Sequence, residues 1–397
     1  MFGQFDPLSL IFYIIIFASI FFLPKLMVYQ IISLLEAKAR SYEEMTEKSQ
    51  KLILKKIDKK TKLSKKEMDS SISRIMDYFV VPPDTTETQG LAKKVRDLTR
   101  RHDKKLDIFV EDITHGMDKI DQKNVAAGLM HTIGIYQVSK IIRHFIELIK
   151  ETKNFTIGMQ LQIMLPFIDK QVKALYASVP AFLDRLPVGD CIGPLYAATL
   201  IGDTKTENIS EGTVVAKKKI NGSDAYILKA DGPAANLGEI DQAVRKIVSK
   251  EKIAKVITVD ASGKLEGEKT GSVAEGIGFA MGPRGAEKFF VESFLIDKGV
   301  SVDAIIVKMK SEEALMPMPK DVLKALPAID EAVKRSIKEA KGKVIIAGIG
   351  VTAGVGNSKE AAEEAKKAVE RYHKKLDAKK KEEERKNRGF FEKIFGK

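Results

Sequence analysis

An uncharged apolar run near the N-terminus constrains this chain more than any other feature. Leu8 to Leu23 reads LSLIFYIIIFASIFFL. Sixteen helical residues rise about 24 Å, which is less than the hydrocarbon core of a bilayer, about 30 Å thick. Apolar residues resume after Lys25 and continue to Leu35, so a span of about 20 residues can be completed while Lys25 reaches toward the interface. The sequence therefore predicts a transmembrane helix within residues 1–35.

The charges that flank this run predict its orientation. Twelve Lys and Arg residues lie from Lys25 to Lys66, whereas none precedes the run. Because Lys and Arg favour the cytoplasmic side of a membrane, we expect a single-pass protein of the cell membrane, with its N-terminus outside and its C-terminal domain in the cytoplasm. A cleaved signal peptide and a buried core helix are the alternatives. A signal peptide needs a basic segment before the apolar run, where the charged side chain is Asp6.

Composition narrows the class of protein. The chain has 397 residues, 44% of them hydrophobic, which suffices for two or three domains with packed cores. Its single cysteine, Cys191, excludes an intramolecular disulfide framework and a cysteine-cluster zinc site. The net charge of +13 favours an anionic neighbour, either lipid or nucleic acid. The basic residues gather in 38–66 and 374–388 without a nucleic-acid-binding motif, so we expect the lipid bilayer as a partner and no nucleic acid.

Apolar periodicity and glycine content divide the rest of the chain. A charged helix beside the membrane is expected to end at Pro82-Pro83. Beyond residue 186 short apolar strands alternate with helices, which is typical of an α/β domain with a mixed, partly parallel sheet. Asn221-Gly222 predicts one antiparallel hairpin. The expected segments are a membrane anchor at 1–35, the charged helix at 36–84, a helical domain at 85–186, the α/β domain at 187–376 and a basic amphipathic tail at 377–397.

The elements expected within these segments follow from the same patterns. The helical domain is predicted to contain helices at 87–115, 117–151 and 155–184. The α/β domain is predicted to contain strands at 213–220, 224–230, 255–260, 302–309 and 343–349, with helices at 193–201, 238–251, 284–298, 328–341 and 358–378.

A glycine-rich turn after the last predicted strand is the strongest local signal. Residues 344–358 read VIIAGIGVTAGVGNS, which is a buried strand, a turn with four glycines, and a helix start at Asn357 or Ser358. Glycine lets backbone N–H groups approach a ligand, and a helix N-terminus favours an anion, so this turn suits phosphate. It matches neither common phosphate-binding glycine motif, and a purely structural tight turn is the alternative.

Further glycine runs precede other helices, and basic residues lie near them. In open α/β sheets ligands bind beyond the carboxyl ends of the strands, so these loops together predict a ligand crevice. Lys229 is among the basic residues near these loops, and the sequence assigns it no separate role. The sequence does not indicate which cofactor or metal, if any, is bound. The expected ligand-binding residues are Gly348, Gly350, Gly354, Gly356, Asn357, Gly276, Gly278, Arg284, Lys269 and Asp231.

Carboxylates fall at the same kind of position. Asp260 ends the strand VITVD, and Asp190 lies in the turn Gly189-Asp190-Cys191. A strand-terminal Asp with a second carboxylate nearby can act as acid and base or hold Mg²⁺, so Asp190 and Asp260 are the candidate catalytic residues. Ordinary solubilising loop residues are the alternative. Cys191 has no His close in the sequence to act as its base, which argues against a catalytic thiol.

The chain as a whole resembles an archaeal family of membrane proteins of unknown function. The resemblance rests on GD-x-IGP at 189–194, KADGPAAN-x-G at 229–238, the KLEGE run at 264–268 and KVI-x-AGIG-x-T-x-GVGN at 343–357, and it implies no particular reaction. A looser likeness, to hydrogenase-maturation endopeptidases, rests on Gly348-Ile349-Gly350 with Gly356-Asn357 and on the Asp190 turn. Here the fragments occur in the reverse order, and Cys191 replaces the second acidic residue.

These features lead to one expected function with two alternatives. The first is a membrane-anchored protein whose α/β domain binds a phosphate-bearing small molecule, such as a nucleotide, in its glycine loops. The alternatives are a peptidase-like hydrolase that uses Asp190 and Asp260, and a non-enzymatic membrane scaffold, which the long helical stretches favour. Whether the protein is an enzyme stays open at this point, and an oligomer is compatible with the sequence.

Overall fold

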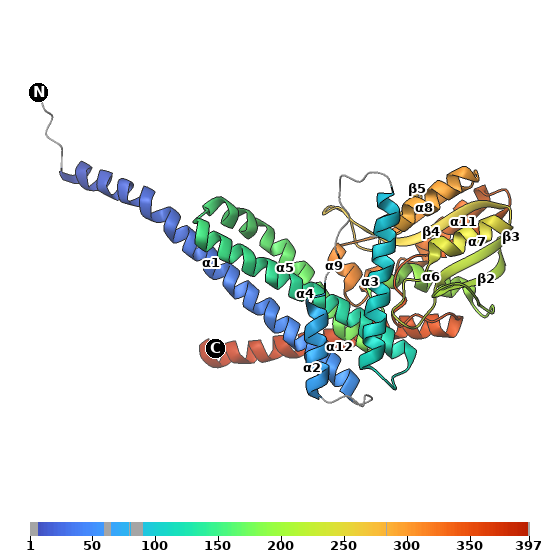
Figure 1. The fold of residues 1–397 in the computed structure, drawn as a ribbon, viewed down its shortest axis with the longest axis horizontal. Helices are drawn as coiled ribbons and strands as arrows, with labels where there is room; N and C mark the ends of the chain where they lie inside the picture. The colour runs from blue at the N-terminus through green and yellow to red at the C-terminus, as the bar shows by residue number, and fades with distance from the viewer. Residues whose placement is uncertain (1–6, 59–64, 79, 81–89, 283, 396–397) are drawn as a thin grey trace, which may run out of the picture.

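A helical region precedes an α/β domain (Figure 1). The computed structural model describes residues 7–58, 65–78, 80, 90–282 and 284–395. Pro82-Pro83, the expected end of the charged helix, lies outside these residues. The helices of the first region are α1 (Pro7–Asp58), α2 (Lys65–Met76), α3 (Leu91–Ile113), α4 (Lys119–Thr152) and α5 (Phe155–Leu183).

Helices α1, α4 and α5 pack into an elongated three-helix bundle (Figure 1). Side-chain caps fix where two of these helices begin: Asp118 accepts a hydrogen bond from the backbone N–H of Asp121, and Asn154 accepts one from that of Thr156. One apolar cluster joins all three helices and includes Ile31, Leu35, Ile142, Ile146 and Leu165. Burying each such side chain contributes about 1.5–3 kcal/mol, so this seam holds the bundle together.

The expected transmembrane helix is not borne out. Helix α1 runs without interruption through the apolar segment, and no helix in the described part of the chain combines the length and apolar character needed to cross a membrane. The apolar run before Lys25 has only sixteen residues. Of the residues expected to complete it, Ile31 and Leu35 are buried against α4 and α5. The predicted anchor and the predicted single-pass location in the cell membrane are therefore wrong.

The α/β domain is built on one seven-stranded mixed sheet. Its strand order is β1-β2-β3-β7-β4-β6-β5, in which β3, β7, β4 and β6 are parallel and form the centre. β1, β2 and β5 pair antiparallel at the two sides. The strands are β1 (Glu207–Ser210), β2 (Thr213–Ile220), β3 (Ser223–Ala230), β4 (Ile253–Gly263), β5 (Val273–Ile277), β6 (Ser301–Met309) and β7 (Lys343–Gly348).

Helices cover both faces of this sheet, so its central strands are buried on two sides. The helical elements are η1 (Gly189–Cys191), α6 (Ile192–Ile201), α7 (Ile240–Lys250), α8 (Gly285–Asp297), α9 (Ser311–Leu315), α10 (Lys320–Leu323), α11 (Leu326–Glu339) and α12 (Lys359–Phe395). Apolar residues of α6, α11 and α12 share one cluster with Ile257 and Val259 of β4. Those of α7 and α8 share another with Val256. The alternation along β4 therefore places one hydrophobic layer on each face.

The mixed α/β domain behind a helical region is the part of the predicted fold that the structure confirms. Asn221 and Gly222 form the predicted hairpin turn with φ angles of 50° and 83°, as a type I′ turn requires. The outer strands β1 and β5 were not predicted. Helix α12 continues well past residue 378, to Phe395, and the side chains of the last part of the expected amphipathic tail lie outside the described residues.

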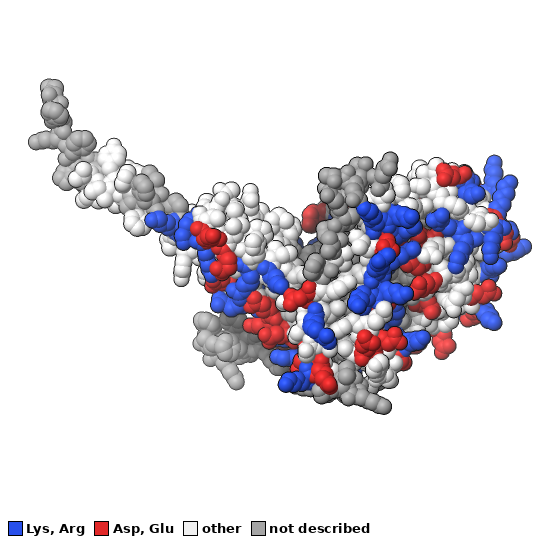
Figure 2. All heavy atoms as spheres, viewed as in Figure 1, with Lys and Arg blue, Asp and Glu red and all other residues white. Residues whose placement is uncertain are grey.

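The surface of the α/β domain carries mixed charge. Figure 2 shows Lys and Arg interleaved with Asp and Glu over this domain, whereas the protruding end of α1 is largely uncharged. Leu10, Phe12 and Phe17 there expose more than half of their surface. Figure 1 shows α3 standing beside the α/β domain, where it contacts α8.

Candidate acid–base site

Three parallel strands bring the candidate residues to one edge of the sheet. Lys229 of β3 and Val259 of β4 both pair with Gly348 of β7, so these three residues lie in one row across the strands. Beyond this row β3 leads into the loop that starts at Asp231 and β7 enters the glycine-rich turn. β4 continues through Asp260 to Gly263, so Asp260 lies within its strand and not at the predicted strand end. Ligands of α/β sheets bind at this carboxyl edge, so chemistry is expected here.

Asp190 and Asp260 reach this edge from different parts of the chain. Asp260 lies in β4 and accepts hydrogen bonds from the backbone N–H groups of Ala261, at 2.7 Å, and Gly282, at 3.0 Å. Asp190 lies in η1, and its Oδ2 accepts from the N–H of Val351, at 2.8 Å, in the turn after β7. Backbone donors therefore fix the orientation of both carboxyl groups.

The two carboxyl groups form one electrostatic unit. Burial raises the pKa of Asp190. Burial, followed by the nearby charge of Asp190, raises the pKa of Asp260 from its ordinary value of 3.8 to about 7. Like charges in a low-dielectric environment disfavour double ionisation, so ionisation of either carboxyl group makes the other harder to ionise.

Lys229 adds an amine to this edge. Its side chain is fully buried, and Nζ donates to the carbonyl oxygen of Ala230, at 2.8 Å, and to Oδ1 of Asn357, at 2.6 Å. Burial lowers the pKa of Lys229 from 10.5 to about 7. The sequence signal was its position in the apolar stretch at 226–230, where a lysine has no solvent to face.

Asn357 ties the strand ends together. Its Oδ1 accepts from Lys229 and from the backbone N–H of Gly232, at 3.2 Å, and its Nδ2 donates to Oδ1 of Asp231, at 2.6 Å. The amide therefore positions the lysine and the β3 loop. Asn357 and Asp231, both predicted to bind a ligand, use these contacts to hold one another.

Neighbouring backbone atoms occupy the space beside the glycines of the turn after β7, which were predicted to bind a ligand. A Cβ atom on Gly348 would lie 2.3 Å from the carbonyl oxygen of Gly193, one on Gly350 2.0 Å from that of Asp190, and one on Gly354 2.1 Å from that of Arg185. The fourth glycine, Gly356, faces Ala361. Glycine here permits close packing of one loop on another. Carbonyl oxygens do not attract an anion, so this geometry gives phosphate binding little support, and that binding stays a prediction.

The other predicted ligand residues lie in and after β5 and in the loop after β4. Gly276 belongs to the edge strand β5, and Gly278 follows it with a φ of 111°. Arg284 donates to the carbonyl oxygen of Gly238 and to Asp103 of α3, and Lys269 lies in the loop after β4. The hydrogen bonds of Asp190 and Asp260 described above do not involve these residues, whose ligand-binding role stays a prediction.

The sequence left a metal site open, and Cys191 bears on it because its turn resembles that of hydrogenase-maturation endopeptidases. Among the described residues no three His, Cys, Asp or Glu side chains are grouped so that they could hold a metal ion. Cys191, which stands where those enzymes have an acidic residue, is fully buried, and burial raises the pKa of its thiol. Its Sγ lies 3.6 Å from the carbonyl oxygen of Ala353. A protonated, buried thiol is neither a metal ligand nor a nucleophile.

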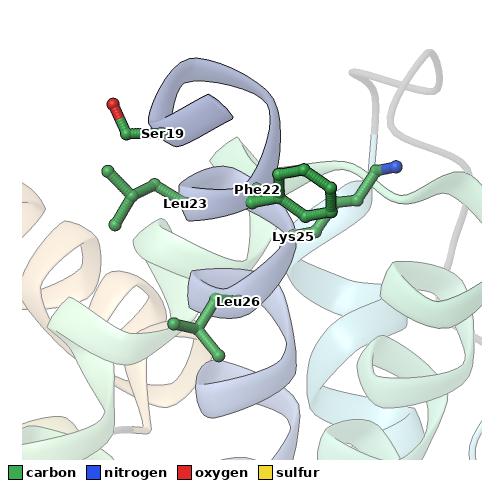
Figure 3. Close-up of a pocket in the computed structure, with 5 residues that line it drawn as sticks. All are labelled: Ser19, Phe22, Leu23, Lys25 and Leu26. Carbon is green, nitrogen blue, oxygen red and sulfur yellow. The ribbon is translucent and has the colours of Figure 1, made fainter. Parts of the chain in front are cut away.

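A separate hollow on α1 is not a comparable site. It is lined by Ser19, Phe22, Leu23, Lys25 and Leu26, all from one helix. Figure 3 shows these side chains spreading away from the helix in different directions. This lining offers one charged group and no converging polar atoms.

Comparison with known sequences places this two-part architecture in a family. The protein is one with a helical N-terminal region and an α/β C-terminal domain. The family described as "Protein of unknown function (DUF1512) N-terminal domain" matches residues 9–185, and "Domain of unknown function (DUF1512) C-terminal" matches residues 188–356. The chain therefore belongs to the DUF1512 family.

Other comparisons add little. No curated protein matches the chain. A crystal structure of a protein of unknown function from Corynebacterium glutamicum ATCC 13032 matches 44% of this chain and 70% of its own, at 18% identity, with a TM-score of 0.21. A superposition this poor carries no argument about the fold or the function.

Proposed function

We propose that the C-terminal α/β domain is a hydrolase in which Asp190 and Asp260 act together as general acid and general base. One observation carries the proposal. The partly buried Asp190 and the buried Asp260 interact electrostatically at the carboxyl edge of the parallel strands, and the pKa of Asp260 is raised to about 7. General acid–base catalysis is most effective when the pKa lies near the working pH, and paired carboxyl groups with shifted pKa values are typical of such sites.

The two protonation states define the roles. The ionised carboxylate accepts a proton from a water molecule as that water attacks a carbonyl carbon. The protonated carboxyl group donates its proton to the leaving nitrogen as the carbon–nitrogen bond breaks. After this step the carboxyl group that took the proton from water is protonated and the other is ionised. Proton exchange with solvent then restores the starting state of the pair. Lys229, which Asn357 positions at the end of β3, adds an amine to the same edge of the sheet.

An amide is the substrate class that fits this arrangement. Amide hydrolysis needs both proton removal from water and proton donation to a poor leaving group, and the pair supplies both. The glycine-rich turn supports this role structurally, because its close packing against the Asp190 loop sets the position of the Val351 N–H. This proposal follows the hydrolase alternative raised by the sequence and involves no metal.

Hydrolysis assays on the full chain test the proposal. A panel of fluorogenic peptide amides and unfolded protein substrates would be assayed with the wild type and with Asp190→Asn and Asp260→Asn. We expect each substitution to lower the rate by about 10²–10⁴-fold. Asp224→Asn, on an exposed residue of β3, is the matched control and should leave the rate unchanged. Turnover that survives in both site variants, or no turnover of any amide, would contradict the proposal.

A further inference from the structure

We infer that the apolar end of α1 packs against a second copy of this chain. This α1 end, residues 10–29, extends beyond α4 and α5, and Ile31 is the first buried residue among the described side chains of α1 (Figure 1). Eight consecutive side chains, from Leu10 to Phe17, each expose between 39% and 66% of their surface. Because eight residues complete two helical turns, this segment is apolar and exposed on every side. The inference does not depend on the proposed hydrolase.

The exposed apolar surface of the α1 end is larger than a monomer usually carries. Within the described residues its exposed large apolar side chains are Leu10, Ile11, Phe12, Tyr13, Ile14, Ile15, Ile16, Phe17, Phe22, Leu23, Leu26, Met27 and Tyr29. Together they present on the order of 1,000 Å², at roughly 150–200 Å² for a large apolar side chain that is about half exposed. The largest apolar patch on a monomer is typically about 300–600 Å², and each partner in a stable interface buries about 800 Å². The α1 end alone therefore suffices for a stable interface.

A second exposed apolar surface borders the first. Met159, Ile163 and Phe167 of α5 are exposed and recur every four residues, so they form a stripe along one face of the helix. A Cβ atom on Gly158 would lie 3.2 Å from the side chain of Ile31, which places the start of this α5 stripe where the α1 end leaves the bundle. The α1 end and the α5 stripe are therefore neighbouring parts of one apolar surface.

An antiparallel pair of chains covers both parts. Helix α5 runs beside α1 in the same direction, because Lys38 donates to Asp169, at 2.8 Å, and farther along Lys56 donates to the carbonyl oxygen of Leu183, at 2.7 Å. The α5 stripe thus lies alongside the part of α1 that follows the α1 end. When two α1 ends pack antiparallel about a two-fold axis, the tip of each one reaches the α5 stripe of the other copy. Figure 1 shows the α/β domain far from this tip, so the two α/β domains lie at opposite ends of the pair.

The chemical pattern of this surface suits a copy of itself. Lys25 is the one charged residue of the α1 end, so the surface offers no charge pattern by which a different, charged partner could be selected. A helix that lies on a lipid surface has a charged face opposite its apolar face, whereas the α1 end is apolar on every side. Two α1 ends bury apolar surface on each other and leave Lys25 to reach solvent at the rim.

The test measures the mass of the full-length protein in detergent-free buffer by sedimentation velocity over a range of concentrations. We expect a particle of two chains. A variant with Ile14→Glu and Phe22→Glu should raise its dissociation constant by at least about 100-fold, because the pair would have to bury four added charges. Ile163→Glu should raise it by at least about tenfold, because this residue lies in the α5 stripe.

The matched control makes the same changes on the α/β domain. Leu265 and Ile296 are both 75% exposed, so Leu265→Glu with Ile296→Glu should leave the mass and the dissociation constant unchanged. Circular dichroism should be the same for all variants, because every substituted side chain is exposed. If the variant with Ile14→Glu and Phe22→Glu fails to fold, Phe22→Glu alone takes its place in the comparison.

Several outcomes would overturn the inference. A wild type that is monomeric at every concentration is one, and a pair that persists unchanged in the variant with Ile14→Glu and Phe22→Glu is another. A mass that keeps rising with concentration beyond two chains would indicate unspecific aggregation instead. A monomer that binds phosphatidylcholine vesicles, and loses this binding in the same variant, would show that lipid covers the α1 end. A pair that Ile163→Glu leaves unchanged would exclude the antiparallel arrangement.

Discussion

Replacement of Asp260 by asparagine should remove the contribution of this residue to the pH dependence of stability. The native state keeps the Asp260 proton up to about pH 7, whereas the unfolded chain loses it near its ordinary pKa of 3.8. The unfolded state therefore binds fewer protons between these values, and stability falls as the pH rises through this window. A pKa difference of about three units between the native and unfolded states corresponds to roughly 4 kcal/mol of unfolding free energy. The two coupled carboxyl groups share this amount.

The variant removes the loss of stability that accompanies ionisation of Asp260, but it also loses a hydrogen bond. The introduced asparagine cannot ionise, but its amide can accept only one of the two hydrogen bonds from Ala261 and Gly282, which costs about 1–2 kcal/mol at every pH. We expect Asp260→Asn and the wild type to be about equally stable at pH 5, because the wild type has by then lost roughly 1.6 kcal/mol, and we expect the variant to be more stable by roughly 2 kcal/mol at pH 8.5. Urea unfolding at both values measures the difference. A variant that is equally destabilised at both would refute this reasoning.

Three other substitutions test neighbouring parts of the site. Asp190→Asn should lower the pKa of Asp260, because the charge of Asp190 raises it. The pH range over which stability falls, from 3.8 to the native pKa of Asp260, should therefore become narrower. An unchanged range in urea unfolding would show that the carboxyl groups are independent. Lys229→Met should stabilise the protein most below pH 7, because the native wild type must bury a charged amine there. The stability gain should vanish as the pH rises from 7 toward 10.5. Urea unfolding at pH 6 and pH 10 measures this difference. Gly193→Ala should destabilise the fold by about 3 kcal/mol or prevent folding, since its Cβ would lie 2.3 Å from the carbonyl oxygens of Ile349 and Val259. Gly263→Ala, whose Cβ would meet no described atom within 4 Å, should be nearly neutral by thermal unfolding, and equal losses in both variants would contradict the packing role of Gly193.

Local patterns predicted most of the helices and central strands of this protein. The hairpin at Asn221-Gly222 depends on adjacent residues, and the alternation of apolar strands with helices reflects a sheet covered on both faces. The short edge strands β1 and β5 bury few residues and therefore leave a weak pattern. The order of the central strands depends on contacts far apart in the sequence, which periodicity does not encode.

The candidate site was predictable in part. The expected strand ends predicted Asp260 and the glycine-rich turn as parts of a site. The structure places Asp190, from a distant part of the chain, beside both. The role of the glycines was less accessible to sequence. A glycine that admits a ligand and one that admits a neighbouring carbonyl oxygen look alike until the partner loop is placed. The same limit affected α1, where the apolar residues needed to complete a membrane span proved to be bundle core.

The acid–base pair can be tested most directly by titrating the carboxyl carbons of ¹³C-labelled Asp residues by NMR in the full-length protein. The account predicts one resonance that titrates near pH 7, far above the ordinary value of 3.8. This resonance should be absent in Asp260→Asn and should titrate at a lower pH in Asp190→Asn. If every Asp resonance titrated below about pH 5, or if the resonance near pH 7 were unaffected by Asp190→Asn, the two carboxyl groups would not form the proposed pair.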